Sequence, residues 1–101
     1  MSYQVEVGGK ADTQLAGLDA AIGASVERKI QWLAQNAAGM VHRRLVGMPD
    51  DLAGLCKLRV GDYRILYWVY PSKRLVRIYR IQHRSEVIAN SRLALDGPQK
   101  C

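Results

Sequence analysis

The sequence predicts a small α+β domain in which an antiparallel sheet carries two helices on one face. Three observations support this prediction: an alternating segment near the N-terminus, a longer apolar stripe at helical spacing, and three alternating segments joined by tight turns. Because a two-stranded ribbon is marginal alone, the N-terminal strand is expected to join the C-terminal meander in one sheet. The length of 101 residues predicts a single domain over residues 1–101.

The N-terminal half contains one predicted strand and two predicted helices. Residues 2–7 alternate between apolar and polar side chains, as a half-buried strand does. Between residues 10 and 36, apolar side chains recur every three or four positions, which predicts an amphipathic helix. Glycine inside a helix costs about 1 kcal/mol. We therefore expect a break between Gly17 and Gly23, with Asp19 capping the second helix.

A loop or a weak extension of the helix is expected at residues 37–51, which are rich in turn residues. It contains the basic triplet His42-Arg43-Arg44. This triplet is interpreted as a solvated surface segment, and the alternative is a secondary contact to phosphate. Ahead of the loop, Trp32 is expected to pack on the sheet.

The C-terminal half contains three predicted strands, at residues 55–60, 63–70 and 74–82. The two-residue turn Gly61-Asp62 suits a hairpin between the first two. In the last strand, strict alternation predicts that Ile78 faces one side of the sheet and Ile81 the other. Residues 89–101 are expected to form a short helical turn or a tail.

The charge distribution favours a polyanionic partner. The net charge is +6, and eight cations fall between residues 56 and 88: Lys57, Arg59, Arg64, Lys73, Arg74, Arg77, Arg80 and Arg84. Such an excess suits nucleic acid or an acidic protein. The sequence has neither an apolar run of about 18 residues nor a signal-peptide core, so we expect no membrane partner and a cytoplasmic location.

Four of these cations are predicted to converge. Lys57 and Arg59 are two residues apart on a strand and share a face, and Arg64 follows after one hairpin turn. Arg84 lies at the end of the next strand. Such a cluster suits a phosphodiester, because guanidinium groups stabilise the negative charge that its transition state gathers.

The cluster also suggests a reaction. Neighbouring positive charges lower the pKa of a lysine, so Lys57 is a candidate to take a proton from a ribose 2′-hydroxyl. The 2′-oxygen would then attack its own phosphate and cleave RNA without a metal or cofactor. The residues alone leave open that this face only binds nucleic acid or an acidic protein. No spacing of Cys and His suggests zinc, and Cys56 is expected to be a buried thiol.

Two motifs, LRVGDYR at residues 58–64 and HRSEV at residues 83–87, together resemble the RelE/ParE superfamily of bacterial type II toxins. The order of predicted elements is similar to that of the superfamily from residue 3 to about residue 88. The chain resembles the RelE branch more than the ParE branch. RelE-type toxins cut mRNA in the ribosomal A site and stop translation, whereas ParE-type toxins inhibit DNA gyrase.

The resemblance implies specific roles for individual residues. It implies that Lys57 abstracts a proton or binds phosphate, that Arg64 stabilises the transition state, and that Arg84 is the general acid for the leaving 5′-oxygen. Further contacts to RNA phosphates are expected at Arg59, His83, Arg80 and Arg77.

The chain departs from the best-studied RelE site at two positions. Ile88 stands where that site has a tyrosine, and Leu55 stands where it has a second lysine. The candidates to replace the missing hydroxyl are Tyr63, Tyr67 and Tyr79. The missing tyrosine supports, as one alternative to the mRNA endonuclease, a non-catalytic module that binds antitoxin or RNA. A gyrase inhibitor of the ParE type is the other alternative.

The resemblance also implies partners. RelE-type toxins are neutralised by a cognate antitoxin whose acidic or amphipathic segment wraps the toxin. The ribosome and its mRNA would be the target, and operator DNA would be reached only through the antitoxin.

Overall fold

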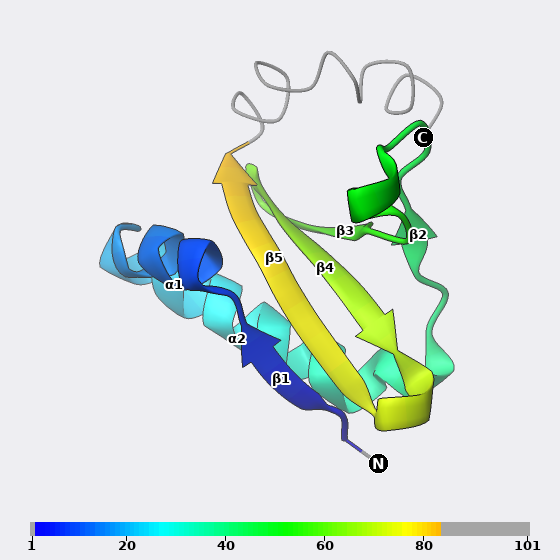
Figure 1. The fold of residues 1–101 in the computed structure, drawn as a ribbon. Coiled ribbons are helices and arrows are strands. Elements are labelled where there is room, and N and C mark those ends of the chain that lie inside the picture. The colour runs from blue at the N-terminus through cyan, green and yellow to red at the C-terminus, as the bar shows by residue number, and fades with distance from the viewer. Residues whose placement is uncertain (1, 84–101) are drawn as a thin grey trace.

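The computed structural model describes residues 2–83, so Arg84, Ile88 and the predicted tail at residues 89–101 lie outside the described residues. Two helices and five strands are arranged as shown in Figure 1. In chain order they are β1 (Gln4–Val7), α1 (Gly9–Ala16), α2 (Ala20–Asn36), β2 (Arg43–Arg44), β3 (Cys56–Val60), β4 (Tyr63–Tyr70) and β5 (Leu75–His83).

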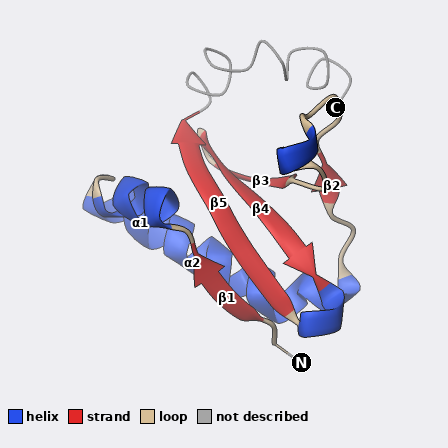
Figure 2. Ribbon diagram, in the orientation of Figure 1, coloured by secondary structure: helices blue, strands red, loops and turns tan. Residues whose placement is uncertain are grey.

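The five strands form one sheet in the order β1-β5-β4-β3-β2. The pairs β2–β3, β3–β4 and β4–β5 are antiparallel, whereas β1 pairs with β5 in parallel. Both helices lie on one side of this sheet (Figure 2). The predicted α+β fold is confirmed, and the sheet is antiparallel except at β1.

The two helices are separated where the sequence predicts a break. Helix α1 ends at Ala16 and α2 begins at Ala20, and Asp19 Oδ2 accepts a hydrogen bond from the Ala21 backbone N–H at 3.3 Å. Trp32, which is expected to pack on the sheet, is 41% exposed and lines a hollow together with Val60 of β3. The apolar stripe that α2 buries lies on a different side of the helix. No helix in residues 2–83 is long and apolar enough to span a membrane.

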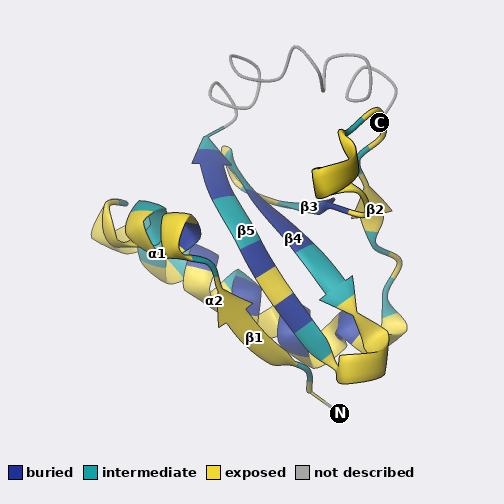
Figure 3. Cartoon of the chain, viewed as in Figure 1, coloured by how far each residue is buried: buried dark blue, intermediate teal, exposed yellow. Residues whose placement is uncertain are grey.

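The core lies between the helices and the face of the sheet that they cover. Its buried members are Ala11, Val26, Ile30, Leu33 and Ala37 from the helical half, and Cys56, Ile65, Tyr67, Val76, Ile78 and Ile81 from the sheet. Figure 3 shows buried residues along β4 and β5, whereas β1 and the outer side of the helices are exposed. The prediction that Cys56 is a buried thiol is confirmed.

A β-bulge interrupts the alternation of β5. Tyr67 pairs with Ile78 and Leu66 pairs with Arg80, so Tyr79 is an extra residue between them. Ile78 and Ile81 are therefore both buried against the helices, at 0% and 2% exposure. The prediction that Ile78 and Ile81 face opposite sides is wrong, because the bulge shifts the alternation by one residue.

Candidate anion-binding site

The face of the sheet opposite α1 and α2, called the open face below, collects positive charge. Arg59 pairs with Arg64 across the β3–β4 hairpin, and Lys57 pairs with Leu66. Directly opposed residues have Cβ atoms about 4.5–5.5 Å apart. Leu58, which lies between Lys57 and Arg59 in β3, points toward the helices and packs against the core. The structure thus brings Lys57, Arg59 and Arg64 together on one face.

Strand β2 adds a fourth cation to this group. Arg43 pairs with Lys57, while its neighbour Arg44 pairs with Cys56. The prediction for residues 37–51 is a loop or a weak helical extension, with a phosphate contact at the basic triplet as the alternative interpretation. In the sequence, the basic triplet was the available signal for a phosphate contact here. The strand itself could not be predicted, because two residues are too short to show the alternation of a strand.

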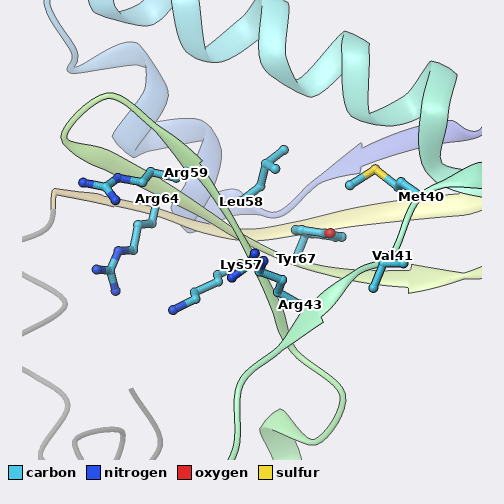
Figure 4. A pocket seen from close by; sticks show the side chains of 8 residues that line it. All are labelled: Met40, Val41, Arg43, Lys57, Leu58, Arg59, Arg64 and Tyr67. Carbon is cyan, nitrogen blue, oxygen red and sulfur yellow. The ribbon is translucent and has the colours of Figure 1, made fainter. Parts of the chain in front are cut away.

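A hollow of about 540 Å³ lies among these side chains (Figure 4). It is lined by Met40, Val41, Arg43, Lys57, Leu58, Arg59, Arg64 and Tyr67. Lys57 and Arg64 are half-buried, and Arg43 and Arg59 are exposed. No lining residue is acidic. Four cations beside one hollow repel each other, and a bound anion relieves that repulsion.

His42 fixes the segment that carries Arg43. Its Nε2 donates to the Ala37 carbonyl oxygen at 2.9 Å, and its Nδ1 accepts from the Tyr67 hydroxyl at 2.7 Å. The two rings meet edge to face, with centroids 5.7 Å apart. His42 therefore ties the end of α2 to β4 and positions the chain just before Arg43.

Of the three candidate tyrosines, Tyr67 lines the hollow and Tyr79 lies on the open face. The Tyr67 hydroxyl is bonded to His42, and burial raises the pKa of the Tyr67 phenol well above its usual range. Tyr63 packs on the core side, with its ring 5.1 Å from that of His83. Tyr79 lies against Trp68 of the open face, with ring centroids 5.1 Å apart.

The remaining predicted phosphate contacts are more scattered. Arg80 is opposite Leu66 on the open face, its guanidinium carbon is 5.0 Å from the Tyr79 ring centroid, and its buried Nε has no hydrogen-bond partner among residues 2–83. Arg77 lies nearer the other end of β5, with Nε 3.8 Å from Glu6 Oε1. The structure does not bring Arg77 to the hollow.

His83 lies on the helix-covered face of the sheet. It pairs with Tyr63, whose side chain packs against the core. Leu55 stands at the place of the family's second lysine and is fully buried. That position therefore contributes to the core in this chain. Arg84 and Ile88, outside the described residues, remain predictions.

The acidic and metal-binding side chains form no comparable group in residues 2–83. Within that range, no three His, Cys, Asp or Glu side chains are placed to hold a metal ion. Burial raises the pKa of the Cys56 thiol, which keeps it protonated at neutral pH despite the nearby Arg44. The chemistry of the site is therefore assigned to its cations.

The family model described as ParE toxin of type II toxin–antitoxin system, parDE, matches residues 5–88. The match covers most of the chain and includes all the described cations of the hollow. The chain belongs to this family and is a toxin of a type II toxin–antitoxin module. No curated protein matches the sequence.

Solved structures of RelE toxins share the fold. The toxin–antitoxin complex RelBE2 from Mycobacterium tuberculosis aligns with a TM-score of 0.69 and 28% identity, over 84% of this chain and 94% of that one. A mutant of the E. coli toxin RelE in the free state aligns with a TM-score of 0.66 and 20% identity, over 99% and 98%. The archaeal RelE–RelB complex from Pyrococcus horikoshii gives 0.65 and 21%, over 83% and 97%.

Proposed function

We propose that this toxin is an endoribonuclease that cuts mRNA on the ribosome and thereby inhibits translation. The observation that carries the proposal is the hollow beside β3, which Lys57, Arg59 and Arg64 line together and whose lining contains no acidic residue. The described part of the chain offers cations where a phosphodiester would need them. The likeness to RelE structures supports the same target class.

The proposed reaction is attack of a ribose 2′-oxygen on the adjacent phosphorus. Lys57 takes the 2′-hydroxyl proton, the new O–P bond forms, and the bond to the 5′-oxygen breaks to leave a 2′,3′-cyclic phosphate. Arg64 donates hydrogen bonds to the phosphate oxygens as negative charge builds on them. Arg84 returns a proton to the leaving 5′-oxygen. Arg43, Arg59 and Arg80 hold the flanking phosphates.

A cognate antitoxin is the second proposed partner. The M. tuberculosis and P. horikoshii structures are complexes of a toxin with its antitoxin. A net charge of +6 suits an acidic antitoxin segment as well as RNA. We propose that antitoxin binding competes with RNA at the open face, in the cytoplasm.

The 2′-hydroxyl provides a direct test of the reaction. Ribosome-bound mRNA is incubated with the toxin, and the cut is mapped by primer extension. The same mRNA with a single 2′-deoxynucleotide on the 5′ side of the cut should stay intact at that position, because the nucleophile is missing. Cleavage of the deoxy-substituted bond would contradict the mechanism.

Gyrase inhibition is the second candidate, because the matching family model is that of ParE toxins. It predicts that the purified toxin blocks DNA supercoiling by gyrase and leaves ribosome-bound mRNA intact. Supercoiling that continues at toxin concentrations sufficient to cut mRNA would exclude this candidate.

A further inference from the structure

A second hollow, of about 380 Å³, lies beside α2. It is lined by Ser25, Arg28, Lys29 and Trp32 of α2 and by Val60 of β3. The four helical residues are spaced at i, i+3, i+4 and i+7, so they share one face of the helix. Trp32 is 41% exposed there, with Lys29 Nζ 4.1 Å from the ring centroid.

The two cations of this helix face have no acidic residue three or four positions away along the helix. Residues three or four positions apart are neighbours in a helix. At these spacings from Arg28 and Lys29 lie only Ala24, Ser25, Val26, Gln31, Trp32 and Leu33. Arg28 Nη2 donates to Ser25 Oγ at 3.2 Å, and that bond leaves its charge in place. Along α2 itself, therefore, no carboxylate lies at these spacings from Arg28 or Lys29.

The composition of this helix face suits RNA better than an acidic peptide. Exposed Gln31 and Gln35 flank Trp32, and α2 contains a single acid, Glu27. Cations bind phosphates, amide groups hydrogen-bond to base edges, and an exposed aromatic ring stacks on bases. An acidic peptide would use the cations but would leave the indole without a specific role.

The linings of the two hollows include neighbouring residues at one end of β3. Arg59 lines the first hollow and the next residue, Val60, lines the second. A single RNA strand that passes around the β3–β4 hairpin would therefore contact both. We propose that this face of α2 is a second RNA contact, where a base stacks on Trp32 and phosphates lie against Arg28 and Lys29. The inference rests on the proposed function, because it takes RNA as the target.

Trp32 can report on this contact by its own fluorescence. In a Trp68→Phe background Trp32 is the remaining tryptophan, and it is titrated with single-stranded oligoadenylate and, separately, with poly-glutamate. Oligoadenylate should quench Trp32, since adenine stacks on indole. Loss of the ring in Trp32→Ala should weaken binding of labelled oligoadenylate about tenfold, whereas Trp32→Phe should keep most of the affinity.

The charge contribution needs a matched control. Lys29→Ala should reduce the slope of log affinity against log salt by about one. Lys10→Ala removes an exposed cation of α1 that lines neither hollow, so the slope should stay nearly unchanged. Equal effects of the two variants would contradict a contact at α2.

The outcomes separate this contact from the cleavage reaction. Oligoadenylate affinity that is unchanged in Trp32→Ala, or quenching of Trp32 by poly-glutamate alone, would overturn the inference even if the toxin cuts ribosome-bound mRNA. Quenching by oligoadenylate in a protein that cuts no mRNA would support the contact and contradict the proposed function.

Discussion

The two faces of the sheet are built by the same strands but have opposite chemistry. On the helix-covered face, Ile65 and Tyr67 of β4 are 0% exposed. On the open face, Arg64 of the same strand lies opposite Arg59. The difference shows that the position of a residue in the alternation decides whether it stabilises the core or contacts a ligand.

The bulge at Tyr79 maintains the division between the buried face and the charged face along β5. Ahead of it Ile78 faces the helices, and beyond it Ile81 does so. Arg80 therefore lies on the open face, opposite Leu66. Without the extra residue in the alternation, Arg80 would point toward the core, where an unpaired charge is costly.

Deleting single residues of β5 is expected to give the largest effect. Removing Arg77 turns Ile78 toward the open face, so the free energy of unfolding should fall by about 3 kcal/mol or more through lost burial. Removing Tyr79 only converts the bulge into regular strand, and should cost about 1 kcal/mol through the lost contact with Trp68. Urea denaturation of the two deletion variants measures both values.

A larger loss of stability from removing Tyr79 than from removing Arg77 would contradict this prediction. If removal of Tyr79 unfolds the protein while removal of Arg77 is tolerated, then the bulge is not what aligns Ile81 and Arg80 with their faces.

The His42–Tyr67 hydrogen bond, which ties the end of α2 to β4, is expected to have a smaller effect. Tyr67→Phe removes the donor to His42 Nδ1 and should lower the free energy of unfolding by about 1–2 kcal/mol. His42→Ala should cost a similar amount, and the double variant should cost less than the sum because the two side chains share one hydrogen bond. Tyr70→Phe is the control, since Tyr70 is 36% exposed. Additive losses would argue against the His42–Tyr67 bond.

Stability should fall at alkaline pH. Burial raises the pKa of the Cys56 thiol and of the Tyr67 phenol in the folded state, so both groups ionise more readily in the unfolded chain. Between the unfolded and folded pKa values the folded state holds more protons, and the free energy of unfolding decreases as pH rises above about 9. The variant Cys56→Ala/Tyr67→Phe should show a shallower decrease in urea denaturation at pH 8 to 11. An equal decrease in both proteins would refute this origin.

The smallest effect is expected at β2. Arg43→Ala should weaken RNA binding a few-fold and reduce the salt slope by about one, because Arg43 lines the hollow. Arg44→Ala is the matched control, since Arg44 pairs with Cys56 and lies outside the hollow's lining. Filter binding of single-stranded RNA at several salt concentrations would measure both. A larger loss in Arg44→Ala would contradict the assignment of Arg43.

Local sequence patterns account for much of the fold. Alternation and the Gly61-Asp62 turn predict β3 and β4, and the same alternation places Lys57, Arg59 and Arg64 together. Strand β2 could not be predicted, because its two residues are held by pairing with β3 and by the His42–Tyr67 bond, which spans 25 residues of sequence. The bulge in β5 depends on tertiary pairing. The local sequence therefore could not predict which face of the sheet Ile81 and His83 occupy.

The central claim is that the cations of the open face cleave RNA. It is tested most directly by the single-turnover rate at which the toxin cuts ribosome-bound mRNA. We expect Arg64→Ala to lower this rate about 100-fold with an unchanged urea midpoint, because a guanidinium that stabilises the transition state is lost. Lys73→Ala, which removes an exposed cation at the β4–β5 turn, should leave the rate within about twofold. Equal rates for Arg64→Ala and the unchanged toxin would contradict the claim.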